Sequence, residues 1–305
     1  MLRNYAASDA PKLLALWNTV GVQMGYVPLP QEKFSRLLLN HPAFSPDYTF
    51  LLEENHTVAA FANGCIGENG DGYISCLLAS NEEQTQALLT SLEAAFRSAG
   101  CKTSRVSFFG PIRLPWVIPG TDGHQHNNVP GVWLEHPLYD RLLRAGYRET
   151  SREIAMYLKL SAFSYPQWVE EKAYTVAQYD PMRHKGLTAM VQSLGNAQWS
   201  AEIPAADREG KELLVGLLGD TCAGFAGPIY PEETGRGYFS GIGVAPEHQG
   251  NGLGTLLFYR LLQREKELGA EYMSLFTGEE NPARRIYSGA GFTPVRKFAV
   301  MEKPL

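Results

Sequence analysis

The chain has 305 residues, of which 44% are hydrophobic and 19% charged, a composition typical of about two globular domains. The net charge of −5 and the lack of a Lys/Arg cluster argue against a nucleic-acid partner. No apolar run approaches the ~20 residues that span a bilayer, and the first residues lack a signal-peptide pattern, so we expect a soluble, cytoplasmic protein.

The amino-terminal half begins with a short strand at 2–5 and an amphipathic helix, followed by a β-hairpin over 48–67. The half continues with a strand, a helix and a second strand that ends near residue 110. It closes with a helix and a strand over 142–160. An insertion over 111–137 is rich in Pro, Gly, Trp and His, and its prolines and tryptophans argue for an ordered, functional loop.

The carboxy-terminal half repeats these elements in the same order, β–α–β–β–β–α–β–α–β. Examples are "GYISCLLAS" from residue 72 against "GYFSGIGVAP" from residue 237. The repeat predicts an α/β fold of two tandem domains, each a mixed, mostly antiparallel sheet flanked by helices. We expect domains at 1–160 and 173–305, joined by a linker over 161–172 in which periodicity lapses.

The stretch "HQGNGLG" (248–254) lies between a strand-like run and an amphipathic helix. Free backbone N–H groups at such a junction favour an anion such as phosphate, which glycine allows to approach closely. A nucleoside-triphosphate P-loop is excluded, because Thr255 and Leu256 follow Gly254 where Lys and Ser/Thr are needed. Two alternatives are open. One is the dinucleotide-binding pattern Gly-x-Gly-x-x-Gly, in which Leu257 stands where the third glycine is needed, and the other is a tight junction that binds no ligand.

The run "QGNGLG" (249–254) resembles the Gln/Arg-x-x-Gly-x-Gly/Ala signature of the GNAT superfamily of acetyl-CoA-dependent N-acyltransferases. The segment "NPARRIYSGAGF" (281–292) is similar to the Asn-x-x-Ala-x-x-x-Tyr-x-x-x-Gly-Phe segment of that family, with one residue fewer between Asn281 and Ala283. The resemblance implies acetyl-CoA as cosubstrate and a catalytic second half. The first half, with Leu142 in place of Tyr287 and no glycine turn, is then a degenerate copy.

The resemblance also implies a diphosphate bound by the glycine turn and a pantetheine arm along the preceding strand, where Gly241 admits close neighbours. The residues expected to bind the cofactor are Ile242, Gly243, Val244, Gln249, Gly250, Asn251, Gly252, Leu253, Gly254, Thr255 and Asn281. Asn281 would alternatively, or in addition, cap the last helix.

Tyr287 occupies the position of the family's proton donor to the departing thiolate; its alternative role is packing against the cofactor arm. The strand before the turn lacks the Glu that many family members use as a general base. Glu279 and Glu280 are therefore candidates acting through water, although such a pair also fits a solvated loop. The remaining acids that could attract an ammonium group are Glu202, Asp207, Glu232 and Glu233.

No metal site is expected, since His124 and His126 have no further ligand at metal-binding spacing. The four cysteines are expected in the core, and packing is the expected role of Trp116, Trp133, Trp168 and Trp199, with a substrate-pocket wall as the alternative.

The predicted function is transfer of an acetyl group to a primary amine of a small molecule. The two-copy organisation is similar to that of the mycothiol synthases, which favours a sugar- or amino-acid-like acceptor, while a peptide or protein amine stays open. The alternative is a non-catalytic acyl-CoA-binding or regulatory protein. The sequence leaves the acyl chain length and the oligomeric state open.

Overall fold

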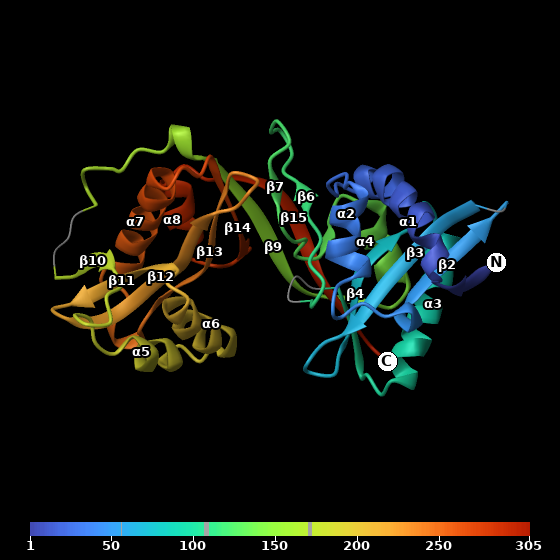
Figure 1. Cartoon of the computed structure of the whole chain (residues 1–305), viewed down its shortest axis with the longest axis horizontal. Helices are drawn as coiled ribbons and strands as arrows, with labels where there is room; N and C mark the ends of the chain where they lie inside the picture. Colours follow the sequence, from blue (N-terminus) through green and yellow to red (C-terminus); the bar gives the residue numbers. More distant parts are fainter. Residues whose placement is uncertain (56, 107–109, 170–172) are drawn as a thin grey trace. The chain divides into compact units, whose positions relative to one another are not determined.

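The structure is a computed structural model that describes residues 1–55, 57–106, 110–169 and 173–305. The chain forms two compact units (Figure 1). The first comprises Met1–Ala155, Phe276–Glu280 and Val295–Leu305, and the second comprises Met156–Leu275 and Asn281–Pro294. None of the helices in the described part has the length and apolar character needed to span a membrane.

The first unit is a mixed sheet in the order β1-β2-β3-β4-β5-β15, in which β4 and β5 are parallel and the other neighbours antiparallel. Its strands are β1 (Leu2–Asn4), β2 (Thr49–Glu54), β3 (Thr57–Ile66), β4 (Gly72–Leu78), β5 (Thr103–Val106), β6 (Trp116–Val117), β7 (Gln125–His126) and β8 (Val132–Trp133). Its helices are α1 (Ala10–Leu16), α2 (Gln31–Phe34), α3 (Glu82–Ser98) and α4 (Pro137–Arg144).

Helices cover both faces of this sheet, as the two hydrophobic clusters demonstrate. One cluster packs α3 and α4 against the sheet through residues such as Leu92, Phe96 and Leu142. The other packs α1 and α2 through Leu13 and Phe34 on the opposite face. These residues recur at helical spacing along each helix, so one apolar stripe per helix is buried.

The last strand of the chain, β15 (Thr293–Pro304), completes the sheet of the first unit rather than that of the second. It runs antiparallel to β5, with Met301 opposite Val106 and Pro304 opposite Thr103. β9 (Arg148–Lys159) is divided between the units at Ala155. The sequence-based ranges 1–160 and 173–305 stay a prediction, because units of repetition and units of packing need not end at the same residues.

The second unit repeats the arrangement, with the sheet order β14-β13-β12-β11-β10 and helices on both faces (Figure 1). Its strands are β10 (Thr175–Gln178), β11 (Glu212–Leu218), β12 (Thr221–Pro231), β13 (Arg236–Val244) and β14 (Tyr272–Gly278). Its helices are α5 (Leu187–Ser193), α6 (Ala197–Arg208), α7 (Leu253–Glu267) and α8 (Arg284–Gly289). Only β13 and β14 are parallel; the other neighbouring strands are antiparallel.

The predicted α/β fold with two tandem copies and the predicted element order are confirmed. The hairpin of the second half turns at 219–220 as expected. That of the first half turns between Glu54 and Thr57, and His56 lies outside the described residues. The insertion 111–137 forms β6, β7 and β8, and all four cysteines are buried.

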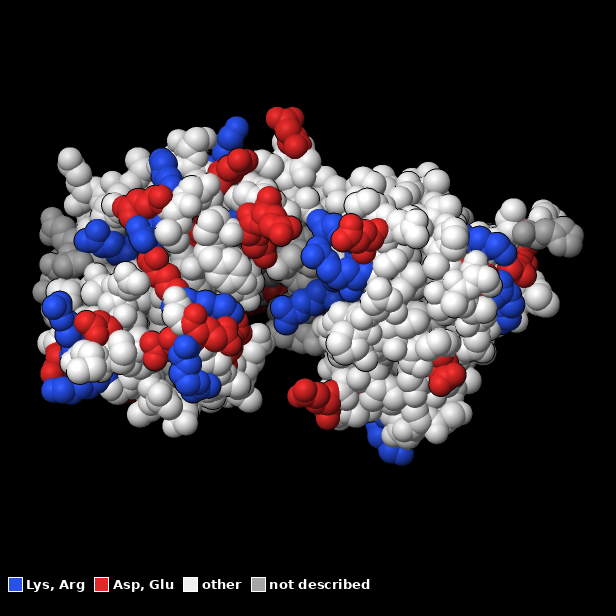
Figure 2. Space-filling model, viewed as in Figure 1, with Lys and Arg blue, Asp and Glu red and all other residues white. Residues whose placement is uncertain are grey.

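The surface carries both signs of charge. On the face drawn in Figure 2, blue and red residues alternate over the part that holds α5, α6 and α7 in Figure 1. A continuous basic stripe of the kind that follows a nucleic-acid backbone is not visible on this face.

Glu265 on α7 is a fully buried carboxyl group that packs against β13 at Gly237. Neither of its oxygens has a hydrogen-bond partner among the described residues. Burial raises the pKa of Glu265 to about 8, against the attraction of Arg236 and with the repulsion of Glu212 and Glu232. The folded chain therefore keeps a proton at Glu265 at neutral pH.

We expect the free energy of unfolding to fall between about pH 5 and pH 8, because the folded state retains a proton that an unfolded glutamate releases. One such proton contributes a slope of up to about 1.4 kcal/mol per pH unit. Glu265→Gln should flatten this slope in urea unfolding measured at pH 6 and pH 8. Glu267→Gln, on the same helix but paired with Arg264 at 3.1 Å, should keep it. A wild-type slope in Glu265→Gln would contradict the assignment.

Candidate functional site

The glycine turn connects the end of β13 to the start of α7. Gly250 and Gly252 have φ values of 77° and 83°, in the left-handed region that glycine adopts without strain. Nothing lies within 4 Å of a Cβ built at either position. The turn itself therefore requires these two glycines, and it leaves the space above them open.

Gly254 differs from the other two glycines. It lies within α7, and a Cβ there would meet only Val244 Cγ2, at 3.8 Å. The fold thus tolerates a side chain at this position. The prediction that Gly254 is glycine because a ligand approaches it closely therefore stays open.

The backbone amides of this junction are the main feature of the site. Leu256 N–H is the first to donate into the helix, to Gly252 O at 3.0 Å. The six preceding N–H groups, from Gly250 to Thr255, donate to none of the described residues. Together with the dipole of a 15-residue helix, they form a cradle suited to a phosphate or diphosphate.

Two polar side chains of the motif support the turn rather than extend from it. Gln249 Nε2 donates to Val244 O at 2.9 Å, which ties the turn to the end of β13. Asn251 Nδ2 donates to Gln249 O at 3.1 Å and to His248 O at 3.4 Å. These side chains stabilise the turn, while the backbone faces the space in which a ligand would lie.

A hollow of about 510 Å³ lies against the start of α7. One wall is formed by Asn251, Gly252, Leu253, Thr255 and Leu256, and the other by Trp168, Val169, Ala173 and Tyr174. Packing was the expected role of Trp168. The residue is 65% exposed, and its ring lies edge-on to that of Tyr259, with the ring centroids 5.5 Å apart. Tyr174 is fixed by a 3.1 Å hydrogen bond between its hydroxyl and His248 Nδ1.

The expected arm-binding residues Ile242, Gly243 and Val244 pair with β12 on one side only. On the other side, the register with β14 covers Arg236 and Gly237 and goes no further. The edge of β13 beyond Gly237 therefore has no partner in that register, and its amides and carbonyls are available to an extended, amide-bearing ligand.

Gly241 and Gly243 admit close neighbours, as predicted. A Cβ at Gly241 would lie 2.5 Å from the Trp199 indole, and one at Gly243 would lie 2.4 Å from Leu194 Cδ1. α5 and α6 therefore press directly on the backbone of β13. Packing was the expected role of Trp199, but its partner, the β13 backbone at Gly241, was not predicted, although paired glycines in a strand are a signal for close packing.

Tyr287 lies on α8 with its ring against Phe258 of α7, at a centroid distance of 4.9 Å. Burial raises the pKa of its phenol above the ordinary value, so the group stays protonated at neutral pH. Asn281 Oδ1 accepts a hydrogen bond from Ala283 N–H at 2.9 Å, which supports the start of α8. The helix-supporting role of Asn281 is therefore present, and cofactor contact stays a prediction.

The two candidate bases differ in their surroundings. Glu279 accepts from Lys297 Nζ at 2.5 Å and lies 3.9 Å from Arg152, so cations of the first unit engage its carboxylate. Glu280 is exposed and directly precedes Asn281. Among the other acids, Glu232 pairs with Arg236 at 2.8 Å, and Glu202 accepts weakly from Tyr238 at 3.5 Å.

The corresponding junction of the first unit is closed by its own side chains. Asn81 caps α3 by accepting from Gln84 N–H at 2.9 Å, and Gln84 Oε1 accepts from Ser80 N–H at 2.8 Å. Arg141 donates to the carbonyls of Ala79 and Ser80. These side chains satisfy the amides of Ser80 and Gln84, so the junction offers fewer free donors to a phosphate than the start of α7 does.

The histidines of the insertion do not form a metal centre with described neighbours. His126 is buried, with its ring 4.4 Å from that of Phe276. In the described ranges, no three His, Cys, Asp or Glu side chains come together as metal ligands would.

Comparison with known proteins agrees with this geometry. Residues 173–292 match the model of the acetyltransferase (GNAT) family. No curated protein sequence matches the chain.

Three solved structures are similar over nearly the whole chain. A GCN5-related N-acetyltransferase from Sphaerobacter thermophilus has a TM-score of 0.70 at 13% identity, covering 100% of this chain and 95% of its own. A tandem GNAT protein from the clavulanic acid biosynthesis pathway has a TM-score of 0.64 at 13% identity, covering 100% and 98%. A glucosamine N-acetyltransferase region of a fungal multi-domain β-N-acetylglucosaminidase has a TM-score of 0.72 at 16% identity, covering 99% of this chain but 38% of that longer one.

The carboxy-terminal half is therefore similar to the acetyltransferase (GNAT) family over residues 173–292. Over its whole length, the chain has the mixed α/β fold of tandem GNAT proteins. The general activity that this family defines is acyl transfer.

The contact between Trp199 and β13 predicts the effect of adding a methyl group there. Gly241→Ala should lower the free energy of unfolding by about 1–3 kcal/mol, because its Cβ would overlap the indole. Gly254→Ala is the matched control and should leave stability unchanged or raise it by up to about 1 kcal/mol. Thermal denaturation without ligand measures both, and equal losses would argue against the close packing of Trp199.

Proposed function

We propose that the second unit transfers an acetyl group from acetyl-CoA directly to a primary amine of a small molecule. The observation that carries this proposal is the row of six unpaired amides from Gly250 to Thr255 beside an open hollow. An anion is the ligand that such a row stabilises. The family match over 173–292 supports coenzyme A as its source.

In this proposal the diphosphate of coenzyme A lies on the turn. The pantetheine arm then extends along the unpaired edge of β13 at Ile242–Val244, where its amides complete the missing strand hydrogen bonds. Because both contacts use backbone groups, cofactor binding depends on the shape of the turn more than on any one side chain.

The reaction begins when the neutral amine nitrogen attacks the thioester carbonyl carbon. A backbone N–H of the β13 edge stabilises the carbonyl oxygen as it becomes negative. The bond between carbon and sulfur then breaks, and the excess proton of the amine passes to solvent or to a base. Glu279 and Glu280 remain the proposed bases through water, and Glu280 is the better candidate because cations engage Glu279.

Tyr287 acts on the departing sulfur. A phenol whose pKa is raised by burial holds its proton more tightly than an ordinary thiol, so complete transfer to the thiolate is uphill. Its larger contribution is a hydrogen bond that stabilises the charge developing on sulfur, before the thiolate takes up a proton.

A matched pair of glycine variants tests the phosphate cradle. Gly252 (φ 83°) lies at the start of α7 and Gly269 (φ 92°) just after its end, and both have open space around them. Alanine at either position should cost about 1–2 kcal/mol of stability through the left-handed backbone. In calorimetry with coenzyme A, Gly252→Ala should weaken binding at least about tenfold, whereas Gly269→Ala should leave it within about twofold. Equal affinities in the two variants would refute the cradle.

Substitution of Tyr287 distinguishes the two proposed functions, an acetyltransferase and a protein that only binds acyl-CoA. Tyr287→Phe should lower kcat by about 10- to 100-fold, with coenzyme A affinity nearly unchanged. The assay follows thiol release from acetyl-CoA over a panel of primary amines, with the acetylated product verified by mass.

Tyr179→Phe, in the same unit, is the control and should retain turnover. If the parent protein binds coenzyme A but acetylates no amine in the panel, the non-catalytic alternative replaces the enzyme. Preference for NAD(H) over coenzyme A would instead support a dinucleotide-binding protein.

A further inference from the structure

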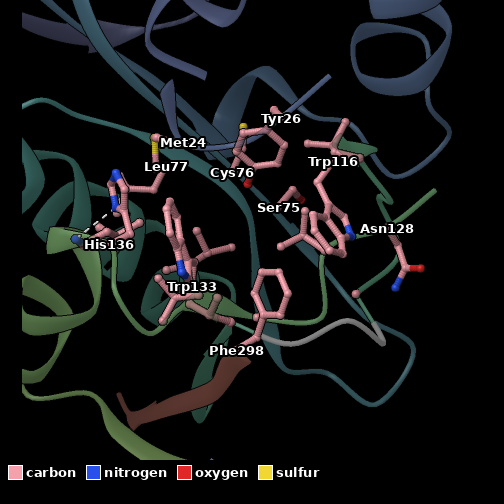
Figure 3. Close-up of a pocket in the computed structure, with 18 of the residues that line it drawn as sticks. Met24, Tyr26, Ser75, Cys76, Leu77, Trp116, Asn128, Trp133, His136 and Phe298 are labelled. Atoms are coloured by element: carbon pink, nitrogen blue, oxygen red, sulfur yellow. Dashed lines mark hydrogen bonds between the residues drawn. The ribbon is translucent and has the colours of Figure 1, made fainter. Parts of the chain in front are cut away.

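An apolar side chain backs the fork of the first unit, the place where the parallel strands β4 and β5 part. Among the described residues, the two strands are in register at Gly72 and Tyr73 of β4. A Cβ at Gly72 would overlap the ring of Phe96, a fully buried residue of α3. Beside these strands lies a pocket whose wall includes Trp133 and Phe298 (Figure 3). The base of this fork is therefore part of an ordinary hydrophobic core.

A carboxyl group lies at the matching position of the second unit. At its fork, β13 and β14 are in register with Gly237 opposite Met273, and Gly237 begins the stretch that repeats the one from Gly72. A Cβ at Gly237 would lie 2.8 Å from Glu265 Cδ. Glu265 of α7 thus lies against its fork as Phe96 of α3 lies against the other. Because the fold accepts an apolar residue here, a fully buried carboxyl group is the more costly choice.

The cation that attracts Glu265 is bound to another carboxylate. Arg236 is buried in β13, and its Nε and Nη2 donate to Glu232 at 2.8 and 3.0 Å. Its Nη1 donates to Ser274 O of β14 at 3.4 Å, which links the two strands beside the fork. Neither oxygen of Glu265 has a hydrogen-bond partner among the described residues. Burial of Glu265 therefore outweighs the attraction of Arg236, and its pKa is raised to about 8.

The other described neighbours of Glu265 supply no free cation. Glu212 of β11 repels it and is itself paired with Arg264 of α7 at 3.0 Å. β14 presents the thioether of Met273 to the same side of Gly237. An ionised Glu265 would therefore need water in place of a partner. Only two residue pairs hold β13 to β14 in this register, so parting the strands there costs less than unfolding the unit.

We propose that Glu265 is a proton-operated latch of the β13–β14 fork. When the carboxyl group is neutral, it packs against Gly237, and the two strands stay paired. When the group releases its proton to solvent, the carboxylate requires water, and the strands part to admit it. The consequence for catalysis rests on the proposed function, because the edge of β13 that would bind the pantetheine arm begins directly beyond Gly237.

Hydrogen exchange of the full-length protein, followed by mass spectrometry, tests the latch. Peptides that cover 235–240 and 270–275 report the opening constant of the fork, once the rates are corrected for the intrinsic effect of pH. The pKa of Glu265 is about 8 in the closed fork and about 4.3 in water, so opening should increase at least about tenfold from pH 6 to pH 8.

Neutral variants of Glu265 should remove this pH dependence. In Glu265→Gln and in Glu265→Met, the opening constant should stay within about twofold between pH 6 and pH 8. Glu267→Gln is the matched control, because Glu267 lies on the same helix but is exposed and paired with Arg264, and it should behave as the parent protein does.

The latch is overturned if opening of the fork in the parent protein is the same at pH 6 and pH 8, or if a folded neutral variant keeps the parent's pH dependence. It is also overturned if the fork peptides exchange with the full free energy of unfolding measured in urea, because the fork then opens only when the unit unfolds. Coenzyme A affinity is measured separately by calorimetry at pH 6. Absence of coenzyme A binding would refute the proposed function and leave the exchange result intact, so the two failures are distinguishable.

Discussion

In each half of the chain, one pair of parallel strands is held in register by two residue pairs among the described residues. These pairs end at Tyr73 of β4, beside β5, and at Gly237 of β13, beside β14. Where two strands part, the backbone groups along their facing edges lose their partners, and something else must satisfy them. In the second half, the edge of β13 beyond Gly237 has no partner in the register with β14, and we propose that the pantetheine arm pairs with it. In the first half the chain's own insertion enters the gap.

The helix that follows the parting strand differs in the same way between the halves. At α7 the glycines hold the turn open and leave a row of amides unpaired. At α3 a capping asparagine and a glutamine satisfy two of the amides, and an arginine from α4 donates to the preceding carbonyls. A few side chains thus distinguish a helix start with free amides, which favours an anion, from one that is partly capped by its own side chains.

The sequence was sufficient to predict the tandem fold, because apolar periodicity and the order of turns recur in both halves. The glycine turn was placed correctly, although left-handed dihedrals, rather than close approach alone, require Gly250 and Gly252. Packing was the expected role of Trp168 and a pocket wall the alternative; the residue is exposed and lines the hollow, since amphipathic patterning does not extend into a loop. Some contacts join segments that are distant in sequence, such as Trp199 with Gly241 or Arg296 with Trp133. No local sequence pattern predicts such contacts.

The position of β15 has a consequence for how the protein is made. The sheet of the first unit needs residues 295–304, which are synthesised about 190 residues after its β5 neighbour. During translation, β5 must wait with an unsatisfied edge while the entire second half emerges, a condition that invites aberrant pairing with other nascent chains. Duplicated genes usually yield modules that can be recombined freely, but here the first unit could not be separated from the second half without losing β15.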